Sequence, residues 1–169
     1  MQGGRKEDGW SGAVQRLVLD VKEAARLSLR EPANIVVKTQ DQKMAVDMSR
    51  ACFVDRDIEL CVQGAMQPDG SMSGSYSLAN VPLALANSMS SEDLPLRFKG
   101  MIEGQGDIRR DAEGNLYGNA SIRSASGGMS RVLVFENEGE PAEEETLLTY
   151  RDFRIDANLS GPDARESGS

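Results

Sequence analysis

The chain has 169 residues and a formal net charge of -8, from 27 acidic and 19 basic side chains. Its length suits one domain, because domains usually contain ~100 to 200 residues. The acidic balance argues against a nucleic-acid binder, which needs a basic surface to contact phosphates. The sequence contains no histidine, so the usual general base at neutral pH and the common histidine ligands of zinc are missing.

The two ends of the chain are polar. Residues 1–9 lack the apolar run of a secretory signal, and we predict that they and residues 161–169 are disordered. Residues 10–160 are predicted to form a single β-rich domain. No run approaches the ~20 apolar residues that span a bilayer. On this basis the chain is either a cytosolic protein or a piece of a longer one.

Most of the domain follows a two-residue rhythm, in which apolar and polar side chains alternate. Segments with this rhythm are, in chain order, 17–22, 25–30, 44–49, 58–63, 72–78, 94–108, 116–122 and 153–159. Each segment has one apolar and one polar face, which is typical of antiparallel sheets with a solvated side. The rhythm therefore predicts an all-β fold.

The two cysteines lie nine positions apart in a segment that reads as strand, turn, strand. If Arg56 and Asp57 form the turn, Cys52 and Cys61 stand directly opposite each other, within reach of a disulfide. The alternatives are a bridge, which implies an oxidising compartment, and two small buried thiols. A bridge also requires a bulge near Arg50, so that the apolar residues on both sides of the bulge share one face.

Two hairpins with the same sequence pattern follow the cysteine segment along the chain. Residues 69–78 align without gaps on residues 113–122: each copy begins with an acidic residue and a glycine, and then places apolar residues or glycine at alternate positions. The incoming strands match as well, so hairpins 58–78 and 102–122 recur. Such a repeat indicates a stack of supersecondary units, and the glycines within the strands favour a strongly curved sheet.

The remaining segments are a short helix and an acidic run. Residues 82–89 form the one predicted helix, with Pro82 suited to its first turn. The acidic residues 136–146 are predicted to form a solvated loop. A calcium site in this loop is the alternative, but the spacing matches no calcium-binding loop. Since no nucleophile has a base and no acidic group has a set of metal partners, the sequence predicts no enzyme activity, no cofactor and no metal site.

Several strings within residues 10–125 resemble the TamB family. They are Ala51–Phe53, Leu60–Gly64, Val81–Leu83, and Leu94–Phe98 followed by Gly100, Ile102 and Gly104. TamB belongs to the AsmA-like family of envelope proteins, which cross the periplasm of diderm bacteria as long β-rich rods anchored in the inner membrane. The resemblance implies that this chain is an internal fragment of such a periplasmic protein.

The resemblance also implies a fold and a function. The fold is a curved, mostly antiparallel sheet that forms an open trough, a slice of a β-taco solenoid with one short helix; a closed β-sandwich is the alternative. The function is to shield the acyl chains of a phospholipid or another lipid in a hydrophobic groove, in support of phospholipid transport and outer-membrane biogenesis. The side chains expected to line this groove are Leu60, Val62, Met72, Tyr76, Leu78, Leu96, Phe98, Ile102, Ile108, Leu116 and Ile122.

The implied protein partner is a TamA-like outer-membrane protein, which other parts of the full-length protein would contact. A second reading is a chaperone or scaffold module of the translocation and assembly complex. In that reading the exposed sheet edges capture strands of outer-membrane proteins, such as autotransporters, by β-augmentation. The two readings differ in what is bound, an acyl chain on a sheet face or a peptide backbone at a sheet edge.

Overall fold

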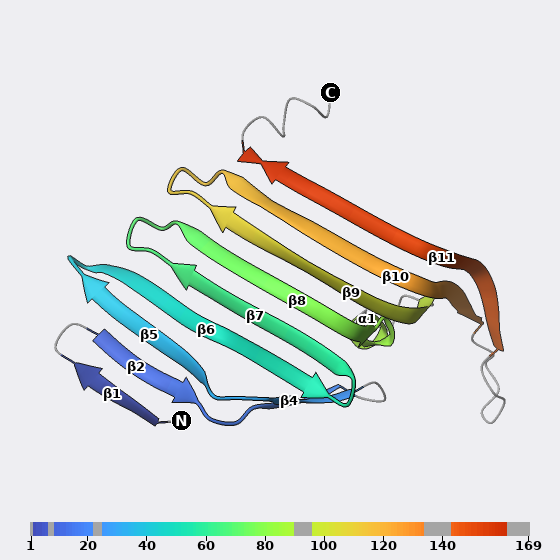
Figure 1. Cartoon of the computed structure of the whole chain (residues 1–169), viewed down its shortest axis with the longest axis horizontal. Coiled ribbons are helices and arrows are strands. Elements are labelled where there is room, and N and C mark those ends of the chain that lie inside the picture. Colours follow the sequence, from blue (N-terminus) through green and yellow to red (C-terminus); the bar gives the residue numbers. More distant parts are fainter. Residues whose placement is uncertain (1, 7–8, 22–24, 90–95, 134–142, 162–169) are drawn as a thin grey trace.

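The computed structural model describes residues 2–6, 9–21, 25–89, 96–133 and 143–161. They form one 11-stranded sheet, in which all neighbouring strands run antiparallel, and one helix (Figure 1). The elements are β1 (Gln2–Lys6), β2 (Gly9–Val14), β3 (Val18–Val21), β4 (Ala25–Leu29), β5 (Ala33–Gln40), β6 (Lys43–Asp55), β7 (Ile58–Met66), β8 (Met72–Pro82), α1 (Ala84–Met89), β9 (Leu96–Arg110), β10 (Leu116–Leu133) and β11 (Glu143–Ser160).

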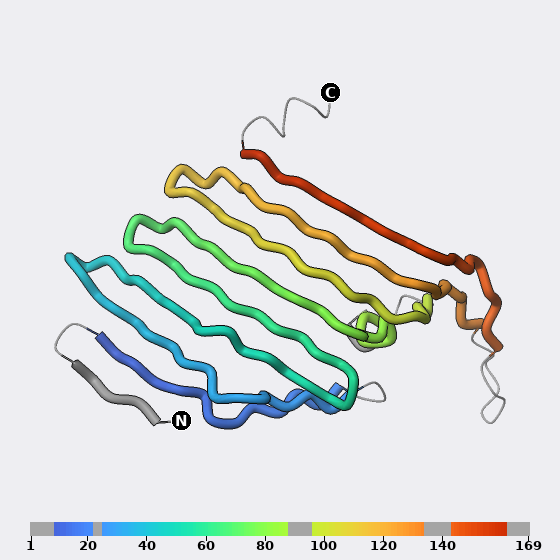
Figure 2. Tube along the Cα trace, in the orientation of Figure 1, coloured from blue at the N-terminus to red at the C-terminus, as the bar shows by residue number. Residues whose placement is uncertain are grey.

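The sheet is a single layer that is not closed. Its order is β1-β2-β5-β6-β7-β8-β9-β10-β11, with the β3–β4 hairpin attached to the end of β6 through β4. Figure 1 shows β1 and β11 at opposite edges of this layer, and the trace in Figure 2 shows β2 and β11 on opposite sides of it. The prediction of an open, antiparallel all-β sheet is therefore confirmed, and the closed β-sandwich is wrong.

Burial agrees with an open layer. Within the described residues, only five apolar side chains are buried, and they are Leu27, Ala33, Ala51, Cys61 and Val81. The accessible surface is 12680 Å², whereas a compact chain of 18.3 kDa is expected to expose about 8,100 Å². The stability of this fold rests mainly on the ladder between strands and on side-chain contacts within each face, because no second layer covers the sheet in the described part of the chain.

The two hairpin loops of the sequence repeat have the same hydrogen bonds. In the first loop the N–H of Gln67 donates to the Ser71 carbonyl (2.8 Å) and that of Gly70 to Gln67 (3.0 Å); in the second, Asp111 donates to Asn115 (3.0 Å) and Gly114 to Asp111 (3.1 Å). Gly70 and Gly114 have φ values of 87° and 94°, in the left-handed region that glycine enters without steric penalty. The acidic-glycine pairs therefore form turns, as predicted.

The cysteine hairpin also has the expected geometry. Asp55 pairs with Ile58 across the two-residue turn, and Cys52 stands opposite Cys61. The two cysteines form a disulfide. The register of β6 against β7 shifts between Met48 and Ala51, so the bulge lies where a bridge required it. Both the bridge and the bulge are confirmed.

The N-terminal prediction was wrong for Gln2–Lys6. These residues form β1, which pairs with β2 over five positions, because the backbone can join a sheet edge whatever the polarity of its side chains. Residues 1 and 7–8 of the predicted disordered end lie outside the described residues, as do residues 162–169 at the other end.

The predicted acidic loop 136–146 is partly strand. Its residues 136–142 lie outside the described part of the chain, but β11 begins at Glu143. Basic residues on β9 and β10 explain why these glutamates are accommodated: Lys99 Nζ of β9 lies 3.0 Å from a Glu144 carboxylate oxygen, and Arg131 of β10 lies 2.6 Å from Glu145. The helix begins at Ala84 rather than Pro82, because Pro82 is the last residue of β8.

Candidate functional site

One face of the sheet is apolar across the strands. Residues directly opposite each other in antiparallel strands point to the same side, so the register defines rows of side chains that share a face. One such row consists of Phe53, Leu60, Leu78, Gly104, Ile122 and Ile155, and the next of Ala51, Val62, Tyr76, Gly106, Ala120 and Ala157. We call the surface formed by these rows and their neighbours the apolar face.

All eleven side chains predicted to line a groove belong to the apolar face. They come from β7, β8, β9 and β10, and the register connects them from strand to strand. On β9, Leu96, Phe98, Gly100 and Ile102 are half-buried while Arg97, Lys99 and Met101 are exposed, so the four half-buried residues share one side of the strand.

The face extends beyond the predicted set. On one side it continues through β6, β5 and β2, where Val46, Val37 and Trp10 form a row with Met66 of β7. On the other side it continues onto β11 with Leu148, Phe153, Ile155 and Leu159. The alternation at 153–159 revealed the strand from the sequence, but its place beside β10 could not be inferred.

Large side chains on this face are exposed. Ile108 is 49% exposed, and the residues opposite it on both neighbouring strands are Gly74 and Gly118. Met72 and Ile155 are each 47% exposed. Apolar patches of this extent are rare on soluble monomers and usually mark a binding surface. The apolar face therefore has the composition and exposure of a surface that contacts an apolar ligand.

Tyrosines lie over glycines at two points of the sheet. A Cβ atom at Gly106 would lie 2.7 Å from Tyr76 Cε1, and one at Gly127 would lie 2.2 Å from the Tyr150 hydroxyl oxygen. The Tyr150 hydroxyl is 2.9 Å from Ser124 Oγ, which donates to the Met101 carbonyl at 2.7 Å. These contacts hold β9, β10 and β11 together where β10 bulges between Arg123 and Gly127. Nothing in the two-residue rhythm predicted this buried polar cluster.

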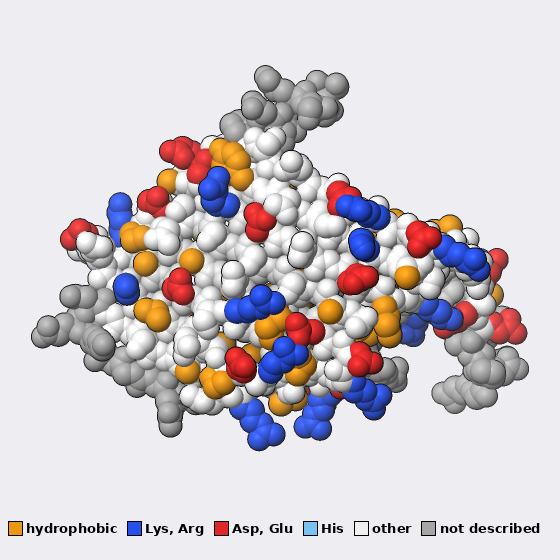
Figure 3. Space-filling view, viewed as in Figure 1, with side chains coloured by type: hydrophobic (Ala, Val, Ile, Leu, Met, Phe, Trp, Pro, Cys, Tyr) orange, Lys and Arg blue, Asp and Glu red, His pale blue; other side chains and the backbone are white. Residues whose placement is uncertain are grey.

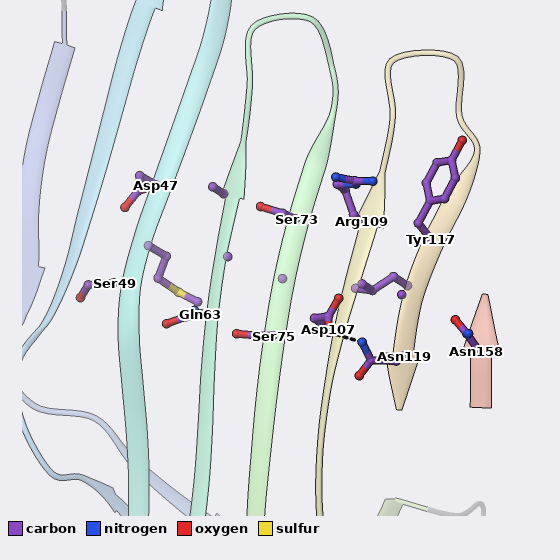
Figure 4. A pocket seen from close by; sticks show the side chains of 16 residues that line it. Asp47, Ser49, Gln63, Ser73, Ser75, Asp107, Arg109, Tyr117, Asn119 and Asn158 are labelled. Carbon is purple, nitrogen blue, oxygen red and sulfur yellow. Dashed lines mark hydrogen bonds between the residues drawn. The ribbon is translucent and has the colours of Figure 1, made fainter. Parts of the chain in front are cut away.

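The opposite face, which we call the polar face, carries serine, amide and charged side chains. A hollow of about 720 Å³ lies over β6 to β11 on this face (Figure 4). The face seen in Figure 3 mixes acidic and basic side chains, with only small hydrophobic patches. From the sequence, we expected apolar side chains to line the hollow of the sheet. This hollow is instead lined mainly by polar side chains, because alternation indicates which residues share a face but not which face is hollowed.

Hydrogen bonds order the hollow and the loop beside it. Asn119 Nδ2 donates to Asp107 Oδ1 at 2.6 Å, and the guanidinium of Arg109 lies 5.3 Å from the centre of the Tyr117 ring. In the adjacent loop, donation by the Asn115 side chain holds the pKa of Asp111 below its ordinary value. Burial, and then the nearby Asp111 carboxylate, raise the pKa of Tyr117.

A family model described as TamB, N-terminal domain, matches residues 2–165. The chain belongs to the TamB family. Comparisons with curated proteins and with solved structures gave no match. TamB proteins are envelope-associated and non-enzymatic, and they function with TamA-like partners. The predicted family is thereby confirmed, and the fold of this TamB segment is the open sheet described above.

The described residues of this TamB segment offer little for metal chemistry. Cys52, Glu59 and Cys61 have ligand atoms close together, but the two sulfurs are bonded to each other, and a metal ligand must be a thiolate. No helix in the described ranges is long and apolar enough to cross a membrane.

Proposed function

We propose that the apolar face of this TamB segment shields lipid acyl chains. In this role it supports phospholipid transport to the outer membrane and outer-membrane biogenesis, as part of a periplasmic protein anchored in the inner membrane. A TamA-like protein would be contacted through other parts of TamB. The observation that carries the proposal is one exposed apolar face that is continuous from β2 to β11.

The physical basis is the unfavourable exposure of acyl chains to water. Each methylene withdrawn from water contributes ~0.8 kcal/mol, so a lipid tail needs an apolar surface along its whole path. The face offers such a surface, whereas the headgroup can stay in water because the residues that the structure describes place no second layer over the sheet. Half-exposed side chains such as Met72 and Ile108 provide contact without a closed pocket, so a tail can move from strand to strand.

Photo-crosslinking in cells tests this proposal. A photoreactive amino acid replaces Phe98 or Ile102 on the apolar face, and the matched controls replace Lys99 or Glu103, the exposed residues that directly follow each of them on β9. We expect lipid adducts from positions 98 and 102 and few from positions 99 and 103. Equal lipid labelling at all four positions, or none at 98 and 102, would contradict the proposal.

A second candidate function rests on the edge strand β11. It has 18 residues and pairs with β10 alone within the described residues, so one side of its backbone can accept another strand. This edge fits capture of an outer-membrane protein strand by β-augmentation. Competition separates the two candidates: a β-strand peptide that displaces a fluorescent lipid shows one shared site, and simultaneous binding shows separate sites.

A further inference from the structure

The hollow on the polar face is long and crosses the strands. It is lined by residues from β6, β7, β8, β9, β10 and β11, and neighbouring strands lie ~4.8 Å apart, so its length is about 24 Å. A second hollow of about 280 Å³ shares Gln63, Ser75, Asp107 and Asn119 with it. A shape of this kind suits an extended ligand that lies perpendicular to the strands.

The floor of the hollow is a ladder with one hydrogen-bonding side chain on each strand. The register places five of these side chains in a single row: Gln63, Ser75, Asp107, Asn119 and Asn158. Ser49 also lines the hollow, from the bulge of β6. Figure 4 shows their side chains along the hollow. The rungs repeat at the strand spacing of ~4.8 Å, which is close to the length of one pyranose unit along a linear glycan.

Several side chains of the ladder have hydrogen-bond donors or acceptors that no described protein group occupies. Within the described residues, Gln63, Ser75 and Asn158 have no protein partner for their side chains, and the single bond between Asn119 and Asp107 leaves the Asn119 amide oxygen open. Small residues on the same face, such as Ala65 and Ser73, keep the ladder accessible. A ligand with many hydroxyl groups, each of which donates and accepts, matches such a mixture of hydroxyl, amide and carboxylate groups.

The charges of the hollow exclude a strongly charged ligand. The charged residues of its lining are Asp47, Asp107 and Arg109, a net charge of only -1, whereas a polyanion needs a basic surface and a polycation a strongly acidic one. We propose that the polar face of this sheet binds a linear, uncharged glycan along the ladder. The site lies on the face opposite to the proposed lipid surface, so it does not depend on the proposed function.

NMR titration of the whole chain with a tetramer of N-acetylglucosamine tests the glycan site. We expect saturable shifts at Ser75, Asp107 and Asn119, and weaker binding of the monosaccharide at an equal concentration of sugar units. Replacing both Gln63 and Asn119 by Ala removes two rungs and should weaken binding ~10-fold, since each lost hydrogen bond contributes ~1 kcal/mol or less. Lys38→Ala, on β5 outside the hollow, is the matched control and should leave binding unchanged.

The outcomes are distinct. No saturable shift at millimolar tetramer, or shifts confined to the apolar face, would overturn the proposal, as would equal affinity of the double variant and the Lys38 variant. The spectrum of the unliganded double variant shows whether it is folded. If it is not, the pattern of shifts in the unsubstituted chain decides alone. Lipid photo-crosslinking that persists when glycan binding is absent would leave the proposed function intact.

Discussion

Replacement of Ile108 by Thr tests whether the apolar face is open. Burying an Ile side chain completely contributes ~1.5 to 3 kcal/mol, but Ile108 is 49% exposed and stands between Gly74 and Gly118. About half of that contribution is therefore realised. Thr keeps the β-branch that strands favour and can solvate its hydroxyl here, so the free energy of unfolding should fall by less than ~1 kcal/mol.

Val81→Thr is the matched control, because Val81 is on the same sheet but only 8% exposed. Val and Thr have nearly the same shape, so the change mainly places a hydroxyl in a site with little water, which costs ~1 to 3 kcal/mol. Urea unfolding of both variants, compared through their midpoints at equal slope, should give the larger loss for Val81→Thr. A loss at Ile108 equal to or greater than that at Val81 would show that Ile108 packs in a closed interior and would refute the open face.

Three further predictions concern the links that hold the single layer together. Replacing Cys52 and Cys61 by Ser should lower the free energy of unfolding by ~2.6 kcal/mol, from the entropy of a loop with a sequence separation of 9; an unchanged urea midpoint would contradict this. Gly127→Ala should destabilise far more than Gly74→Ala, because the new Cβ would lie 2.2 Å from the Tyr150 hydroxyl oxygen in the first case and 3.5 Å from its nearest neighbour in the second; equal melting temperatures would count against the Tyr150 contact. The pKa of Asp111 is lowered in the folded state by its bonds from Asn115, so its contribution to stability is present above the ordinary value of 3.8 and is lost as pH falls through the folded pKa. Asp111→Ala should therefore reduce the acid-dependent loss of stability, and an unaltered pH profile would show that the bond contributes nothing.

The alternation of apolar and polar residues predicted more of this structure than the residues of the loops did. Because the side chains of a strand change sides at every residue, the positions of Leu78 and Ile122 already indicated the face that they share. The repeat was also informative, because its Asp-Gly and Glu-Gly pairs indicated two turns. In these turns Gly70 and Gly114 adopt left-handed backbone conformations. A bridge between Cys52 and Cys61 fitted the apolar pattern only if the strand also had a bulge near Arg50. Both the bridge and the bulge occur.

What the sequence could not reveal depends on contacts between distant segments. β1 exists because the edge of β2 accepts it, and no property of its own side chains signals a strand. Glu144 enters a strand because Lys99 and Ser130 lie beside it after pairing. The Ser124 and Tyr150 cluster joins residues 26 positions apart. The polar hollow depends on the curvature of the whole sheet, for which alternation contains no information.

Contact between acyl chains and the apolar face can be measured most directly with a phospholipid that carries a nitroxide on its tail. Paramagnetic broadening would be recorded at methyl groups on both faces, Leu78, Ile108 and Ile122 against Val54 and Ala65, which the register places on the polar face. The account predicts much stronger broadening of the first three methyl signals than of the other two. Equal broadening on the two faces, or stronger broadening at Val54 and Ala65, would contradict it.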